Sequence, residues 1–173
     1  RPRPAGNSRE ALAFYINAYN AWILHEALAK HPAKSVKDPL FTFFRGDRIR
    51  VAGEKLSFNK LEKGIIRKRF EEPRIHFALN CASRSCPPLL DEPYQGSKLA
   101  AQLEGQTRSF INSPKGLRVN GETWTLSRIF EWYKEDFGGE RKMLEFVNHY
   151  RKGSTLPKSV SYEEYDWRLN EAK

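Results

Sequence analysis

The sequence predicts a single α+β domain, in which several helices pack on a small, mostly antiparallel sheet with two hairpins. Segments with helical periodicity and capping residues alternate with short segments rich in β-forming residues. The dipeptide Asn120-Gly121, at the centre of one such segment, is a strong hairpin signal and requires antiparallel neighbours. The 173 residues, 39% of them hydrophobic, suffice for one buried core. We therefore expect a basic tail at residues 1–7 and one domain over residues 8–173.

The first element is a long helix over about residues 8–30, followed by a hairpin. Asn7 and Glu10 have the spacing of a capping box. The apolar positions of "SREALAFYINAYNAWILHEALAK" go nearly all the way round the helix, which indicates burial on more than one side. In the hairpin, "DRIRV" and "KLSF" flank the turn residues "AGE". Ser57 then caps a second helix, "FNKLEKGIIRKRF", which Pro73 closes.

Residues 74–80, "RIHFALN", are predicted to form the central strand. The run is short, apolar and bounded by turn residues. The stretch that follows, as far as Gly96, is typical of a loop or a single broken turn. Ser97 begins an amphipathic helix that extends to about residue 112.

A second hairpin, "LRVNGETWTL", is expected over residues 117–126. Ser127 caps the next helix, "SRIFEWYKEDF", and Gly153 ends a last helix over about residues 140–152. The remaining segment, "SYEEYDWRLN", has enough Trp and Tyr to dock back on the domain.

The net charge of +9 favours an anionic partner. The cationic residues are dispersed and form no strip interleaved with aromatic residues, so the pattern does not favour nucleic acid. No apolar run approaches the ~18 residues of a membrane-spanning helix, and we expect no transmembrane segment. The chain's two cysteines cannot define a disulfide-rich scaffold.

Both cysteines lie in one short stretch, and Cys81-x4-Cys86 has four interpretations. A thiol nucleophile needs a stabilised thiolate and a base within reach. A zinc site needs three or four ligands, but the sequence has no third Cys and its histidines are scattered, so we expect no metal. A short disulfide ring and a pair of inert, half-buried thiols complete the alternatives, and spacing alone does not decide among them.

The neighbours of the cysteines support the nucleophile in part. Because Pro87 favours the first position of a helix, Cys86 is expected at a helix N-cap, and Arg84 is close enough to lower the pKa of either thiol. In an extended strand His76 is about 16 Å from Cys81 and meets Cys86 only if the loop folds back.

Polar residues inside predicted helices raise two further questions. Asn17 and Asn20 share a face of the first helix, where a buried amide must be hydrogen-bonded. Each is either a structural amide that holds a loop or an amide that orients a histidine or an oxyanion. Glu131 and Glu135 also share a helix face and point the same way, so we expect a solvated face and no glycosidase pair.

Four segments, "FYINAYNAW", "RIHFALNCASRSCPPL", "LSRIFEWYKEDF" and "YDWRLN", resemble the successive motifs of the domain-of-unknown-function 547 family, over about residues 9–170. Some members are exported or envelope proteins of bacteria, which favours an exported location, and some eukaryotic members carry a glutaredoxin-like or leucine-zipper region. The glutaredoxin-like companion points to thiol chemistry only by association. The resemblance implies a functional surface formed by the positions that match the motifs: Asn17, Asn20, His76, Asn80, Cys81, Arg84, Cys86 and Pro87.

With the resemblance added, the leading hypothesis is a cysteine-dependent hydrolase or acyl transferase that acts on a small-molecule or peptide substrate without a cofactor. Cys86 is the expected nucleophile, Cys81 its substitute or resolving thiol, and His76 the base. An asparagine of the first helix orients His76, and backbone N–H groups of residues 82–87 form the oxyanion hole. Two alternatives remain: a binding module whose Arg84 grips an anionic peptide, glycan or lipid headgroup, and a thiol–disulfide redox module.

Overall fold

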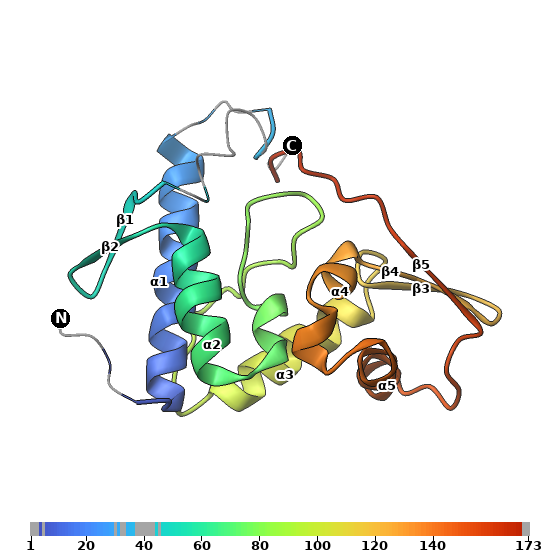
Figure 1. The fold of residues 1–173 in the computed structure, drawn as a ribbon. Helices are drawn as coiled ribbons and strands as arrows, with labels where there is room; N and C mark the ends of the chain where they lie inside the picture. The colour runs from blue at the N-terminus through green and yellow to red at the C-terminus, as the bar shows by residue number, and fades with distance from the viewer. Residues whose placement is uncertain are drawn as a thin grey trace.

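The structure of this 173-residue chain is a computed structural model that describes residues 4, 6–29, 31, 34–36, 44 and 46–170. In this part of the chain, five α-helices and two small sheets form an α+β domain (Figure 1). The predicted fold class is confirmed at that level. Most of the expected tail at residues 1–7 lies outside the described residues.

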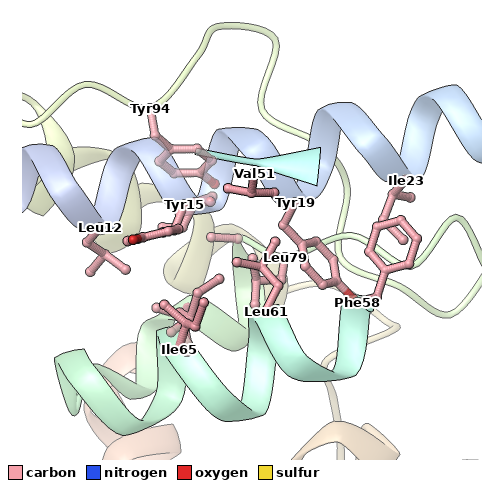
Figure 2. Close-up of a cluster of buried hydrophobic side chains, with 14 of the residues drawn as sticks. Leu12, Tyr15, Tyr19, Ile23, Val51, Phe58, Leu61, Ile65, Leu79 and Tyr94 are labelled. Carbon is pink, nitrogen blue, oxygen red and sulfur yellow. The ribbon is translucent and has the colours of Figure 1, made fainter. Parts of the chain in front are cut away.

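Helix α1 (Arg9–Ala29) is the longest element of the fold. Its cap is Ser8, whose hydroxyl accepts a hydrogen bond from the N–H of Ala11 at 3.1 Å, so the cap lies one residue beyond the expected Asn7. Tyr15 and Tyr19 extend from α1 toward the helix that follows the first hairpin (Figure 2). They place α1 against that helix across a layer of buried side chains.

The first hairpin is confirmed, with β1 (Ile49–Val51) antiparallel to β2 (Glu54–Leu56). The cap at Ser57 is confirmed as well, because its hydroxyl accepts the N–H of Lys60 at 3.1 Å. The helix begins as a π-helix, η1 (Lys60–Ile66), and continues as α2 (Arg67–Phe70). A π-helical turn is rare and often marks a functional position.

The predicted central strand at residues 74–80 is wrong. Residues Pro73–Phe77 form a 3₁₀ helix, η2, and no sheet includes them. Pro73 presets the first helical turn, and the carboxylate of Glu72 accepts the N–H of Arg74 at 3.1 Å, which caps it. A short apolar run fits a buried helix as well as a strand, and here the proline and the cap favour the helix.

Helix α3 (Leu99–Ile111) begins two residues after the expected Ser97. The second hairpin is confirmed, with β3 (Leu117–Asn120) antiparallel to β4 (Thr123–Leu126). Gly121 supplies the positive φ of its turn, at +58°. A third strand, β5 (Ser159–Tyr162), pairs with β4 in parallel and was not predicted.

The helices that follow β4 confirm the predicted cap. The Ser127 hydroxyl accepts the N–H of Ile129 at 3.4 Å and begins α4 (Arg128–Trp132). The predicted helix breaks there and continues as a 3₁₀ turn, η3 (Lys134–Phe137). Helix α5 (Glu140–Arg151) then leads to β5.

The core has two clusters of buried side chains, and η2 lies where they meet. One cluster lies between α1, η1 and the first hairpin (Figure 2), and the other between α3, β4, α4 and α5. Ile75 belongs to the first cluster and Phe77 to the second. A 3₁₀ helix turns about 120° per residue, so consecutive side chains point in three directions, whereas a strand sends alternate residues to one side. This geometry leaves His76, between Ile75 and Phe77, at the boundary of the two clusters.

Candidate functional site

A cavity of about 360 Å³ lies at this boundary between the two clusters. Its aromatic lining comes from both halves of the chain: Tyr19, Phe44, Trp132, Tyr133, Tyr165 and Trp167. Its polar lining includes both cysteines and the buried histidine: Asn59, Glu62, Lys63, His76, Cys81 and Cys86. An apolar cavity with a few convergent polar groups is the usual form of a small-molecule site.

The cysteine loop (residues 80–87) is held in shape by Asn80. The side-chain oxygen of Asn80 accepts the N–H of Ala82 at 2.6 Å, and its amide nitrogen donates to the carbonyl of Pro87 at 2.7 Å. Ala82 has a left-handed φ of +60°, which makes the turn tight. Asn80 therefore joins both ends of the loop and brings the two cysteines together.

The two sulfur atoms lie 2.9 Å apart, and both cysteines are free. The Sγ of Cys81 is also 3.0 Å from the hydroxyl of Ser83 and 3.2 Å from the hydroxyl of Tyr165. The hydrogen bond from the Cys86 thiol lowers the pKa of Cys81 to about 6, helped by those from Ser83 and Tyr165 and opposed by burial. A pKa lowered in this way favours the thiolate form of Cys81 at neutral pH.

Cys86 differs from Cys81 in the direction of its pKa shift. It is buried, and its thiol takes part in the hydrogen bond to Cys81. Burial raises the pKa of Cys86 well above its ordinary value, and the neighbouring Cys81 raises it further. The loop therefore holds one acidic thiol on the cavity wall beside one that stays protonated.

His76 is fixed by a carboxylate that the sequence did not single out. Its Nε2 lies 2.8 Å from Oδ2 of Asp136 in η3. Arg67 donates two hydrogen bonds to the same carboxylate, at 2.6 and 2.7 Å. Burial raises the pKa of Asp136, but the hydrogen bonds from His76 and Arg67 outweigh it and hold this pKa well below its usual range. Asp136 therefore stays charged and fixes the imidazole of His76 through Nε2.

Tyr133 and Glu62 complete this wall of the cavity. The ring of Tyr133 stacks on the imidazole of His76, with centroids 3.8 Å apart. Its hydroxyl donates to Glu62 Oε1 at 2.9 Å, and Glu62 comes from the π-helical turn. Burial and the charge of Glu62 raise the pKa of Tyr133, so the hydroxyl remains a donor.

His76 and the cysteines share the cavity without direct contact. Within the described ranges no hydrogen bond joins His76 to either sulfur. The contact with Cys86 through a folded-back loop is therefore not formed as a hydrogen bond, and His76 and the cysteines are instead separate parts of one cavity lining. A proton can pass between them only through a substrate or a water molecule.

The expected oxyanion hole in the cysteine loop is not formed, because the loop's backbone N–H groups already have acceptors. The N–H of Ser83 supports the thiolate of Cys81, and Pro87 has none. The others donate as follows: Ala82 to Asn80 Oδ1, Arg84 to the carbonyl of Arg168, Ser85 to the carbonyl of Asp166, and Cys86 to the carbonyl of Ser83.

Asn17 and Asn20 make structural contacts. Asn20 donates to the carbonyl of Ala78 and accepts the N–H of Asn80, both at 2.9 Å, so it holds the start of the cysteine loop against α1. Asn17 makes the same pair of bonds with the backbone of Tyr94, at 2.7 and 2.9 Å. Neither amide is part of the cavity lining or contacts His76, so a direct role in binding has no support from these contacts.

The two remaining sequence candidates, Arg84 and Pro87, belong to the cysteine loop itself. Pro87 lines the cavity, but residues 87–95 form no helix, so Cys86 is not an N-cap. The peptide N–H of Arg84 is tied to Arg168, and the guanidinium acts electrostatically on Asp166. Hydrogen bonds from Cys86, Ser83 and Tyr165, rather than Arg84, account for the acidity of Cys81. Binding of an anionic partner by Arg84 stays a prediction.

Sequence reasoning missed Asp136, Tyr165, Tyr19 and Glu62. Asp136 stands between Tyr133 and the buried Phe137, so aromatic neighbours were a usable sign that this carboxylate faces inward. Tyr165 lies in the segment whose Trp and Tyr residues were expected to dock back on the domain, whereas Tyr19 and Glu62 gave no such sign. Among the described residues, no three His, Cys, Asp or Glu side chains gather as metal ligands, and no helix is both long and apolar enough to cross a bilayer.

A family model described as "Protein of unknown function, DUF547" matches residues 5–111. The chain belongs to this family. No curated protein and no solved structure matches the chain. The matched part of this DUF547 protein contains His76 and both cysteines, whereas Trp132, Tyr133, Asp136 and Tyr165 lie beyond it. The site is thus assembled from both the matched segment and the rest of the chain.

Proposed function

We propose that this DUF547 protein is a cysteine-dependent acyl-transfer enzyme, a hydrolase or acyl transferase, with Cys81 as nucleophile and His76 as general acid and base. One observation carries the proposal: Cys81 is a thiol of lowered pKa on the wall of a cavity that His76 also lines. Cys86 was the nucleophile expected from the sequence. Its burial and raised pKa suit it better to donating the hydrogen bond that stabilises the Cys81 thiolate.

In the first half-reaction, the Cys81 thiolate attacks the carbonyl carbon of the substrate, and the carbonyl electron pair moves onto oxygen as the S–C bond forms. The intermediate then collapses, the bond to the leaving oxygen or nitrogen breaks, and protonated His76 gives that atom its proton. Because Cys81 is already ionised at neutral pH, this step needs no base in contact with the sulfur.

In the second half-reaction, neutral His76 takes a proton from water or from an acceptor alcohol or amine, which attacks the thioester. The S–C bond breaks, the acyl group leaves on the acceptor, and the thiolate is restored. Asp136 stabilises the imidazolium that forms in this step and fixes the ring. With the loop N–H groups engaged, donors to the oxyanion would come from cavity side chains, among which are Tyr19, Asn59 and Lys63.

The aromatic lining favours a substrate with an apolar or planar acyl group, and the cavity volume of about 360 Å³ suits a small one. A generic activated ester can serve as the first test substrate, because it acylates a reactive thiolate without specific recognition.

The test is p-nitrophenyl acetate with mapping of the acetylated peptide by mass spectrometry. We expect a burst of nitrophenolate with the acetyl group on Cys81, no burst with Cys81→Ser, and a retained but slower burst with Cys86→Ala. His76→Ala should keep the burst, because nitrophenolate leaves without a proton. It should slow deacylation by about 10²-fold or more, the usual size of general-base catalysis. Acetylation of neither cysteine, or deacylation unchanged in His76→Ala, contradicts the proposal.

A second function, thiol–disulfide exchange, is favoured by the 2.9 Å approach of the two sulfurs. The Cys81 thiolate would attack one sulfur of a substrate disulfide and release the other as a thiolate, and Cys86 would then resolve the mixed disulfide as an internal disulfide forms. This function needs both cysteines, whereas acyl transfer needs only Cys81. Incubation of Cys86→Ala with oxidised glutathione separates the two. A stable mixed disulfide on Cys81 of Cys86→Ala, together with no ester burst from the wild-type protein that has not met oxidised glutathione, supports exchange and removes acyl transfer.

A further inference from the structure

The C-terminal segment (residues 163–170) binds along the cysteine loop. Ser83 and Leu169 form an antiparallel β-bridge. Further backbone bonds join the two segments: Arg84 N–H to Arg168 carbonyl at 2.9 Å, Asn170 N–H to Ala82 carbonyl at 2.9 Å, and Asp166 N–H to the Ser85 hydroxyl at 2.8 Å. The C-terminal segment is therefore fixed relative to the thiols by hydrogen bonds, and Figure 1 shows it running from β5 toward the C-terminal end of α1.

The opposite edge of the segment is held as well. The N–H of Val36 and the hydroxyl of Ser35 both donate to the carbonyl of Trp167, at 2.9 and 3.0 Å. The ring of Tyr165 packs against Trp167 and Trp132, with centroids 4.5 and 4.8 Å away. Backbone and ring contacts together fix the direction of the Tyr165 hydroxyl.

That hydroxyl lies 3.2 Å from the Sγ of Cys81 and 3.1 Å from the Oγ of Ser83. The proton positions follow from the chemistry of the groups. A thiolate only accepts, so the Tyr165 hydroxyl donates to Cys81. The single proton of the Ser83 hydroxyl goes either to the same sulfur, 3.0 Å away, or to the oxygen of Tyr165. Burial and the two cysteines raise the pKa of Tyr165, which keeps this donor protonated.

From this geometry we propose that Tyr165 is a positioning residue for Cys81, and that its hydroxyl, held in place by the C-terminal segment, donates a hydrogen bond that keeps the sulfur as a thiolate. The inference rests on the proposed function in one respect, because both take Cys81 as the cysteine that reacts with the substrate. It also assigns a role to the C-terminal segment, which lies beyond the part of the chain matched by the family model.

Other titratable groups line the same cavity and are left unchanged by a tyrosine-to-phenylalanine substitution: Tyr19, Glu62, Lys63, His76, Cys86 and Tyr133. Tyr165→Phe keeps the ring and its packing on both tryptophans and removes only the hydroxyl. Tyr162→Phe, in β5 of the same C-terminal region, is the matched control, because Tyr162 neither lines the cavity nor contacts the thiols.

The experiment measures the rate of iodoacetamide labelling of Cys81 against pH, with peptide mapping, in wild type, Tyr165→Phe and Tyr162→Phe. A hydrogen bond to a charged group predicts a rise of roughly one to two units in the pKa of Cys81 in Tyr165→Phe. At a pH below the pKa of Cys81 in both proteins, labelling of the variant should be about tenfold slower for each unit by which its pKa is higher. Tyr162→Phe should titrate like wild type. A purely structural role would lower thermal stability without moving this titration.

An unchanged titration in Tyr165→Phe overturns the inference, as does an ordinary thiol pKa for Cys81 in the wild type. Ser83→Ala provides a second background that keeps the Tyr165 hydroxyl, and adding Tyr165→Phe to it should raise the pKa of Cys81 further; no further rise also overturns the inference. The proposed function fails by a different result, the absence of ester acylation at Cys81, so the two failures are distinguishable.

Discussion

Asp136 joins His76 to Arg67, and its replacement by asparagine tests this arrangement directly. Asp136→Asn keeps the shape of the side chain but removes the charge that Arg67 and His76 share. Breaking a buried ion pair from one side costs about 3–5 kcal/mol, whereas an exposed pair is worth at most about 1 kcal/mol. The Asp136 side chain is 25% exposed, nearer the buried limit. We therefore expect unfolding free energy to fall by about 2–3 kcal/mol, which lowers Tm by roughly 4–12 °C for a domain of this size.

The assay is urea denaturation of wild type and Asp136→Asn at several pH values. A carboxyl whose folded pKa is depressed stabilises the fold above its unfolded pKa of ~3.9, and this contribution is lost as pH falls through the folded pKa. The difference between the proteins should thus be full at neutral pH and shrink as the solution becomes acid. Glu131→Gln, which breaks an exposed pair with Arg128, is the matched control and should cost under about 0.5 kcal/mol. A loss for Asp136→Asn as small as that of the control, or one that does not depend on pH, refutes the reasoning.

Two further substitutions test the supports of the fold. Asn20→Ala should cost about 2–4 kcal/mol in urea denaturation, because it leaves the carbonyl of Ala78 and the N–H of Asn80 buried without partners; a loss below about 1 kcal/mol would mean that water replaces the amide. Gly105→Ala, inside α3 with open space around its Cβ position, should raise the unfolding free energy by about 0.5–1 kcal/mol. Gly121→Ala should lower it by about 1 kcal/mol because its φ is +58°, and equal signs for the two glycines would contradict this account.

The parts of the fold that were predicted correctly depend on local chemistry. Ser57 and Ser127 cap their helices with their own hydroxyls, and the Asn120-Gly121 turn needs only the backbone freedom of its glycine. Such signals lie within a few residues of the structure they determine. The central strand failed because burial in two directions made residues 74–80 apolar, and a buried helical turn has the same composition as a buried strand.

Of the residues that line the candidate site, the sequence identified mainly those between His76 and Pro87. His76 and the two cysteines were identified from the sequence, but their partners are distant along the chain: Asp136 is 60 residues from His76, and Tyr165 is 84 residues from Cys81. The nucleophile was assigned to Cys86 because Pro87 suggested a helix start, whereas the acidity of Cys81 depends on contacts that only the folded chain brings together. The pairing of β5 with β4, which leads the C-terminal segment back to the thiols, is equally non-local.

The separation between Cys81 and Tyr165 has a consequence for how the protein is made. Synthesis proceeds at about 5–20 residues per second, so the tyrosine is added roughly 4–17 s after the cysteine. During that interval the nascent chain has the Cys81 thiol but not the Tyr165 hydroxyl that donates to it in the folded protein. The hydrogen bond that we propose for the acidity of Cys81 therefore forms only after the C-terminal segment has been synthesised and has docked on the cysteine loop.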